Sequence, residues 1–348
     1  MEFEIIRLLV LSTLAFIFTI AWTPVWTKIL YKYRLGKQIR NSGETPIFSA
    51  LHAAKKGTPT MGGVLIWVTV LLFAIFFYVL SMWWPALKSF NFLSRAETWL
   101  PLGALVASAL VGLFDDWLDV RGKGLKGGGG LNIKHRLMIY TAIAAIGAWW
   151  FYIKLDRQDF GIPFLGNFNL GWWYIPVFIF VIVATSFSVN ETDGLDGLAG
   201  GVLLTSFSSY SVIAFMIGQY NLAAFCAVVV GALLAFLWFN INPARFYMGD
   251  TGAMSLGVTL GVIAMLTDTA LILPIIGLVF VIESCSVLIQ LTSKKLRHGK
   301  KIFLSAPIHH HFEAIGWPEP KVVMRFWVVA GISSAVGLAI FLLDKIIK

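Results

Sequence analysis

Six aspartates lie at the ends of long apolar segments, where ionised side chains are unusual. They are Asp115, Asp116, Asp119, Asp193, Asp196 and Asp250. Ionisable groups at or near membrane depth are costly and tend to mark a functional site, although ordinary helix ends also carry charge at the water boundary. Carboxylates of this kind can bind magnesium together with phosphate oxygens. We expect the six aspartates to meet at one face of a membrane.

The first three aspartates are spaced so that their roles should differ. Asp115 and Asp116 are neighbours, so on a helix their side chains point about 100° apart. Asp119 lies one turn beyond Asp115, on the same face. Basic residues follow, up to Lys134 and Arg136. Acids beside bases form either a self-neutralising surface or a magnesium and phosphate site, and the spacing leaves both open.

Two apolar segments are joined by residues 190–197, which indicates a tight helical hairpin. Asn190, Asp193 and Asp196 recur every three residues, so they share one side if the segment stays helical. Gly194 and Gly197 permit a sharp turn and the close approach of a ligand. A plain turn needs only one Asp, so a functional interpretation is favoured here.

Asp250 stands at the start of the apolar segment 251–266. A lone Asp before a helix is by default an N-cap. Its flanking residues Gly249 and Gly252, and its place on the same predicted face as the other acids, make it our candidate magnesium ligand.

Two further polar stretches belong to the same predicted face. Lys55 precedes the second apolar segment, where lysines can receive phosphate, although charge alone favours a simple membrane anchor. Three consecutive histidines, His309, His310 and His311, cannot all turn to one ion, which argues against zinc. Donation to phosphate or a sugar fits them better. Glu283, inside an apolar run, is assigned no chemistry.

The elements that must position these residues are membrane-spanning helices. Of 348 residues, 58% are hydrophobic and only 13% are charged, whereas soluble domains carry roughly 25% charged residues. The fold class predicted is all-α, a single polytopic membrane domain over residues 1–348. About ten spans are expected, at residues 5–27, 61–81, 100–114, 137–151, 172–189, 198–217, 222–239, 251–266, 270–289 and 326–343.

The distribution of basic residues predicts the orientation of these spans. Five loops hold 20 of the 27 Lys and Arg residues: 28–60, 115–136, 190–197, 240–250 and 290–325. The positive-inside rule therefore predicts that they face the cytoplasm, with both termini on the periplasmic or outer side. Orientation and anionic lipid explain the net charge of +9, so nucleic acid is not expected as a partner.

The remaining features are less informative. Cys226 and Cys285 fall in apolar runs and indicate neither a disulfide framework nor a metal site. The first apolar segment lacks a basic region before it, so we expect a retained span and not a signal peptide. Residues 156–170 contain several Gly, Pro and Asn, which predicts turns or a small hairpin.

Five motifs together resemble the bacterial phospho-N-acetylmuramoyl-pentapeptide transferases, over essentially the whole chain. They are KKGTPTMGG (55–63), FDDW (114–117), NETDGLDGLAGG (190–201), FLWFNINPARFYMGDTG (236–252) and APIHHHFEAIGWPEPKVVMRFW (306–327). The acid pair and the NxxDGxDGL hairpin are similar to those of the wider superfamily of polyprenyl-phosphate N-acetylhexosamine-1-phosphate transferases. PIHHHFE with GWPEP resembles the muramoyl-pentapeptide branch specifically.

The resemblance implies a definite reaction in peptidoglycan synthesis. Phospho-N-acetylmuramoyl-pentapeptide moves from its UDP form to undecaprenyl phosphate, which yields lipid I and UMP and requires Mg2+. The implied location is the bacterial inner membrane with the site facing the cytoplasm, and a homodimer is implied as well. The residues do not decide between direct transfer and an aspartyl-phosphate intermediate.

The resemblance also implies roles for individual residues. Asp115 is implied to be the base or the acid that orients the lipid phosphate, Asp116 its partner, and Asp250 the magnesium ligand. The residues implied to bind substrate are Lys55, Thr60, Asn190, Asp193, Gly194, Leu195, Asp196, His309, His310 and His311.

The chain departs from the family pattern in three places. Asp119 stands where lysine is common, and Glu191 stands where an apolar residue is usual. The stretch 123–130 (KGLKGGGG) reads as an insertion, so the family's downstream lysine is matched by either Lys134 or Arg136.

Two other functions are weighed against this one. A sister transferase would move N-acetylglucosamine-1-phosphate from its UDP form to a polyprenyl phosphate, and PIHHHFE argues against it. A transporter or lipid flippase would also hold charge in the membrane, but such sites tend to lie near the midplane. The acids here gather at one predicted face.

Overall fold

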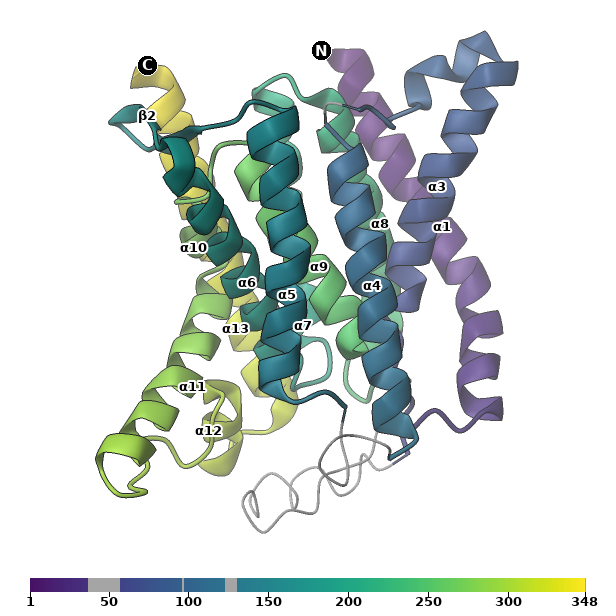
Figure 1. The fold of residues 1–348 in the computed structure, drawn as a ribbon. Helices are drawn as coiled ribbons and strands as arrows, with labels where there is room; N and C mark the ends of the chain where they lie inside the picture. Colours follow the sequence, from purple (N-terminus) through teal and green to yellow (C-terminus); the bar gives the residue numbers. More distant parts are fainter. Residues whose placement is uncertain (37–56, 96, 123–129, 348) are drawn as a thin grey trace.

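The computed structural model describes residues 1–36, 57–95, 97–122 and 130–347, and they form a bundle of long helices (Figure 1). Nine helices in this part of the chain are long and apolar enough to cross a membrane. The all-α, polytopic prediction is therefore confirmed. The long helices outside the region 270–296 are α1 (Glu2–Lys32), α3 (Val64–Trp83), α4 (Trp99–Val120), α5 (Ile133–Trp149), α6 (Tyr174–Thr192), α7 (Leu198–Met216), α8 (Tyr220–Asn240), α9 (Gly249–Leu266) and α13 (Glu319–Ile347).

The predicted span 270–289 differs from the others because it is broken. It forms the short helix α10 (Leu273–Ile276) and, after Gly277, the helix α11 (Leu278–Leu296). α11 is not among the nine candidate spans, since any 18 residues of it include Glu283, Lys294 and Lys295. Hydropathy could not reveal this break, because a lone glycine in an apolar run does not by itself end a helix. α10 and α11 link α9 to the short helix α12 (Ile308–Ala314) at the opposite end of the bundle (Figure 1).

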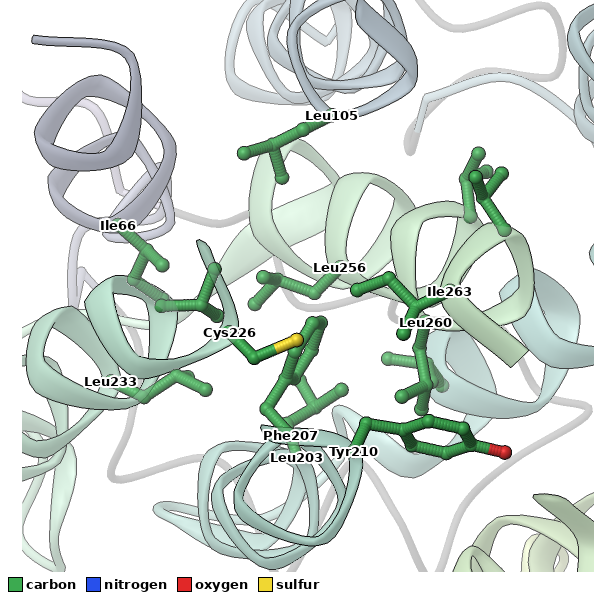
Figure 2. Packing of buried hydrophobic residues seen from close by; sticks show 14 of the residues in the cluster. Ile66, Leu105, Leu203, Phe207, Tyr210, Cys226, Leu233, Leu256, Leu260 and Ile263 are labelled. Carbon is green, nitrogen blue, oxygen red and sulfur yellow. The ribbon is translucent and has the colours of Figure 1, made fainter. Parts of the chain in front are cut away.

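Helix α9 is the centre of the bundle. Within it, 94% of the span is buried, and it contacts α3, α4, α5, α6 and α7. Figure 2 shows how apolar side chains from the surrounding helices, such as Leu105 of α4 and Phe207 of α7, pack around Leu256 and Leu260 of α9. Small residues let these helices approach closely, as is common in membrane bundles. Whatever stands at the first turn of α9 is therefore held by several helices at once.

One end of the molecule carries both chain termini and a small hairpin (Figure 1). Strands β1 (Asp159–Ile162) and β2 (Gly166–Asn169) pair antiparallel, with Asp159 opposite Asn169. This confirms the hairpin predicted for residues 156–170. Three short helical turns lie outside the long helices: η2 (Pro85–Phe90), the π-helical turn η3 (Trp150–Lys154) and η4 (Gly171–Trp173).

The opposite end brings together segments that are distant in sequence. The backbone N–H of Tyr247 donates to the carbonyl of Pro59 at 2.8 Å, and Gly62 and Gly63 donate to the carbonyls of Tyr247 and Met248, also at 2.8 Å. These bonds hold residues 59–63 against the loop that precedes α9. The first turn of α9 thereby lies beside the segment leading into α3.

Candidate active site

Three carboxylates project from the last two turns of α4. The helix does not stop at residue 114, where the apolar run ends, but continues to Val120. Asp115, Asp116 and Asp119 are all buried, with 2%, 4% and 9% of their surfaces exposed. Burial of three acids in one helix end is costly unless each finds partners, and each does.

Asp115 and Asp119 share a face, as their spacing predicted. Asp119 accepts a hydrogen bond from the backbone N–H of Gly130 at 3.1 Å, and Asp115 accepts one from the N–H of Leu131. Asn132 then caps α5, since its side chain accepts from the N–H of His135 at 3.0 Å. The two acids of α4 therefore fix the point at which α5 begins.

Asp116 points elsewhere and caps the neighbouring helix α9. One carboxylate oxygen accepts from the backbone N–H of Asp250 at 3.0 Å and from the Thr60 hydroxyl at 3.2 Å. The other accepts from the N–H of Thr251 at 3.0 Å. These N–H groups belong to the first turn of α9 and have no partner within that helix. The different directions predicted for Asp115 and Asp116 are confirmed, and the N-cap considered for Asp250 is supplied by Asp116 instead.

The carboxylate of Asp250 is thereby left to face other side chains. Its Oδ2 accepts from Nη2 of Arg136 at 2.6 Å, and its Oδ1 accepts from Nδ2 of Asn190, also at 2.6 Å. Nη1 of Arg136 donates to Oδ1 of Asn190 at 3.0 Å, and Nε of Arg136 lies 2.9 Å from Oδ2 of Asp115. Four helices, α4, α5, α6 and α9, thus each contribute one member of a closed polar network.

Arg136 is the cation of this network. The sequence left Lys134 and Arg136 as alternatives, and the structure places Arg136 between the acids while Lys134 is exposed. The side chains of Arg136 and Asp250 remain 23% and 18% exposed, whereas that of Asp115 is 3% exposed. A ligand can therefore reach Asp250 and the guanidinium more easily than Asp115.

The donor set of this network suits magnesium. Asp115 and Asp250 provide carboxylate oxygens, and with Asp116 nearby the negative charges outnumber the single guanidinium. The described residues contain no group of three or more His, Cys, Asp or Glu able to hold a metal on their own. Magnesium does not need one, because it is commonly bound by one or two carboxylates together with substrate phosphates and water.

The hairpin between α6 and α7 splits its polar residues between two directions. α6 ends at Thr192, so the helical repeat that would align Asn190, Asp193 and Asp196 is interrupted. Asp193 accepts from the N–H of Gly249 at 3.2 Å and so faces the start of α9, as Asn190 does. Asp196 instead accepts from Nδ2 of Asn242 at 3.0 Å and from the N–H of Ala244 at 3.1 Å. The common side considered for all three required a continuous helix, and without one Asp196 faces away from the other two.

Neighbours of Asp196 also serve the fold. Leu195 is 4% exposed and belongs to the apolar core. Glu319 of α13 accepts from the N–H of Asp196 at 2.7 Å and from Nδ2 of Asn242 at 3.1 Å. Asn242 and Glu319 were not singled out from the sequence, because nothing in their spacing links two loops 77 residues apart. Substrate contacts for Leu195 and Asp196 stay predictions.

The three histidines lie on α12, and their Nδ1 atoms have three different partners. Nδ1 of His309 is 2.9 Å from Glu283, and Nδ1 of His310 is 2.7 Å from Glu313. Nδ1 of His311 accepts from the N–H of Leu304 at 3.2 Å. The histidine helix lies beside the hairpin, since a Cβ added to Gly194 would be 2.8 Å from Cε1 of His309.

The first predicted motif is described in part. Thr60 is 1% exposed and reaches the site through its bond to Asp116. Lys55 lies outside the described residues, so its phosphate contact stays a prediction.

The chain is similar in sequence to known proteins along most of its length. Residues 98–268 match Glycosyl transferase family 4, and residues 55–66 match the Phospho-N-acetylmuramoyl-pentapeptide-transferase signature 1. Relatives named phospho-N-acetylmuramoyl-pentapeptide-transferase include one from Chloroflexus aggregans, 39% identical over 98% of this chain and 91% of its own. One from a Geobacillus species is 39% identical, covering 94% and 95%. One from Listeria monocytogenes is 36% identical, also covering 94% and 95%.

Proposed function

The chain belongs to the phospho-N-acetylmuramoyl-pentapeptide-transferases, and from this premise we propose its substrates, its cofactor and its site. The donor is UDP-N-acetylmuramoyl-pentapeptide and the acceptor is undecaprenyl phosphate. The family resemblance of the motifs is confirmed, and with it a phospho-sugar transferase that serves lipid I synthesis in peptidoglycan synthesis. The products of the proposed reaction are lipid I and UMP.

The observation that carries the proposed site is the network of Asp115, Arg136, Asn190 and Asp250. Attack by an acceptor phosphate oxygen on the donor pyrophosphate brings several negative charges together. In such reactions, positioning and charge stabilisation account for most of the catalysis. The partly exposed guanidinium of Arg136 supplies positive charge at the same end of the bundle as the aspartates. Asp115, buried beside it, is suited to orient the acceptor phosphate or to receive its proton.

Magnesium is part of the proposal. Asp250, with Asp115 as a second donor, would hold the ion beside the substrate phosphates. Bound there, magnesium would offset charge on the transferring phosphoryl group and the leaving UMP. Arg136 and Asn190 would keep the carboxylate of Asp250 oriented, since both contact it directly.

We further propose that this end of the bundle faces the cytoplasm of a bacterial inner membrane. Basic residues support it: Lys294 and Lys295 close α11 at the end that carries the site. Uridine nucleotide sugars are cytoplasmic, so a donor site belongs there. The homodimer implied by the family resemblance stays a prediction.

The experiment that tests the function is UMP release by purified protein given both substrates, with and without magnesium. We expect magnesium-dependent release in the wild type and a loss of about 100-fold or more in Asp250→Asn, because charge stabilisation in the transition state would be lost. Asp159→Asn, the same chemical change in the distant hairpin, should leave the rate unchanged.

Asp116→Asn is informative in a different way. Because Asp116 holds the first turn of α9, this variant should lose thermal stability as well as activity.

Activity that survives Asp250→Asn would contradict the proposed site. Consumption of UDP-N-acetylglucosamine alone would favour the sister transferase, and lipid transport without UMP release would favour a flippase.

A further inference from the structure

A buried carboxylate in α11 is not used by the proposed reaction. Glu283 lies in the second turn of α11, and its surface is 0% exposed. Burying a carboxylate among apolar helices is costly unless its charge is paired or hydrogen-bonded. The partner of Glu283 is therefore informative about why the residue is there.

That partner is the first histidine of α12. Nδ1 of His309 lies 2.9 Å from Oε2 of Glu283, and the backbone N–H of His309 is 3.5 Å from the same oxygen. Both side chains are completely buried. When Glu283 is ionised its oxygen accepts, so Nδ1 of His309 carries the proton in this pair. The bond crosses from α11 to α12 and therefore fixes both the position and the plane of the imidazole ring.

The other ring nitrogen of His309 meets the hairpin between α6 and α7. Nε2 is buried and has no hydrogen-bond partner among the described residues. A Cβ added to Gly194 would overlap this atom and would also lie 3.2 Å from Nε2 of His310. Only a residue without a side chain allows the turn to approach so closely. Any ligand group that bonds to Nε2 would consequently touch the same turn.

The turn that contains Gly194 also contacts the start of α9, next to the polar network. Asp193, the neighbour of Gly194, accepts from the N–H of Gly249, which precedes Asp250. A chain of direct contacts therefore runs from Glu283 through His309 and the turn to the first residues of α9.

We propose that Glu283 is a positioning residue that acts through His309, holding the imidazole in the tautomer and orientation that present Nε2 to the donor nucleotide-sugar at the 193–197 turn. This rests on the proposed function and on the substrate contact that the family resemblance implies for His309. Glu283 itself touches neither substrate nor reacting atoms. A hydrogen bond to the second nitrogen of a histidine generally sets which ring nitrogen is free for a ligand.

Steady-state kinetics of UMP release provide the first test. Glu283→Gln should raise the KM for the donor about tenfold, the size expected for a misdirected polar contact. The kcat should change by less than about threefold, and the KM for undecaprenyl phosphate should not change, because uniform donor binding is what is lost.

A double-mutant comparison separates positioning from a merely structural effect. If Glu283 acts through His309, the double variant Glu283→Gln with His309→Ala should have the donor KM of His309→Ala alone. Ser284→Ala is the matched control. It removes a partly buried 2.7 Å bond between α11 and Ser188 of α6 and should leave the donor KM unchanged. Multiplicative effects in the double variant, or an equal rise in the control, would overturn the proposal.

A readout that needs no turnover keeps the proposal separate from the proposed function. Protein labelled with ¹⁵N-histidine has six histidines, and the spectrum of His309→Gln identifies the signal of His309. We expect Nδ1 to be protonated. Nε2 should be unprotonated in the free protein and hydrogen-bonded when the donor nucleotide-sugar is added. Glu283→Gln should alter the signals of both nitrogens. Glu283→Asp should restore part of the wild-type pattern.

The two failures are then distinguishable. A wild type that releases no UMP but shows the Nδ1 proton and its dependence on Glu283 would reject the proposed function and retain the positioning. An active wild type in which Nδ1 of His309 carries no proton, or in which Glu283→Gln changes neither spectrum nor donor KM, would reject the positioning.

Discussion

At the scale of single residues, one guanidinium organises the candidate site. Arg136 lies between Asp115 and Asp250 and also donates to Asn190. Its planar fork can satisfy three partners from three helices at once, which a lysine ammonium cannot do with the same geometry. The closeness of two carboxylates is tolerable only because this cation stands between them.

Substitutions of Arg136 should therefore differ according to whether they keep the positive charge. We expect Arg136→Lys to lower kcat for UMP release about tenfold and Arg136→Gln about 100-fold, because the first keeps the charge and the second removes it. Lys134→Gln, an exposed neighbour on the same turn, serves as control. Equal rates for Arg136→Gln and the control would contradict the role of the network.

A glycine next to Asp250 gives a second residue-scale prediction. Gly249 has φ +73°, and a Cβ there would lie 2.5 Å from both Oδ2 of Asp116 and Oγ1 of Thr60. Gly249→Ala should lose stability by about 2–4 kcal/mol, from left-handed strain plus collision, and should lose activity.

The control for Gly249→Ala separates strain from collision. Gly218 has φ +82° with nothing within 4 Å of an added Cβ, so Gly218→Ala carries the backbone strain alone, about 1–2 kcal/mol. Unfolding in denaturant would measure both. Similar losses for the two variants would show that the Asp116 contact does not limit this position.

At the scale of elements, the site depends on how closely α4 and α9 approach. Gly112 of α4 is the contact point: an added Cβ would lie 2.7 Å from Cα of Thr251 and would overlap the backbone of Asp250. The same helix pair carries Asp116 and the N–H groups that it caps. Separating α4 from α9 would therefore have two effects at once: it would loosen the cap on α9 and displace Asp250.

Gly112→Ala should accordingly reduce both stability and UMP release. We expect a loss of about 1–3 kcal/mol, as for overpacked cores. Gly103→Ala, on the same helix with nothing within 4 Å of the added Cβ, should be neutral or stabilising by up to about 1 kcal/mol. Thermal unfolding of the two variants side by side checks this, and a Gly112→Ala protein as stable and active as Gly103→Ala would refute it.

At the scale of the whole molecule, the two ends of the bundle differ in chemistry. One end carries the termini and the β1–β2 hairpin, and the other carries α12 and the site (Figure 1). The proposed orientation assigns the first end to the outside of the cell and the second to the cytoplasm.

Cysteine labelling tests this sidedness. Cys285 is exposed and Cys226 is buried, so the background is Cys285→Ser. In it, Leu165→Cys and Lys300→Cys each place one accessible thiol, at the hairpin and before α12 respectively. Both positions are exposed. An impermeant maleimide should label Leu165→Cys in intact spheroplasts and Lys300→Cys only after disruption. The reverse pattern would invert the proposed orientation.

The sequence alone was sufficient for the fold class, for most helix positions and for the gathering of acids at helix ends. These properties are local, because apolar length determines which segments can span a membrane and a charge near such a segment is conspicuous wherever the helix packs. The different directions of Asp115 and Asp116 also followed from helix geometry alone.

Partner choice was decided only by the tertiary structure. The selection of Arg136 over Lys134, the capping of α9 by Asp116, the turning away of Asp196 and the pairing of Glu283 with His309 all join residues from different elements. Each depends on the rotation and spacing of packed helices. Small residues such as Gly112 and Gly194 set that spacing through contacts with remote segments, and no periodicity along one chain encodes which remote segment it will be.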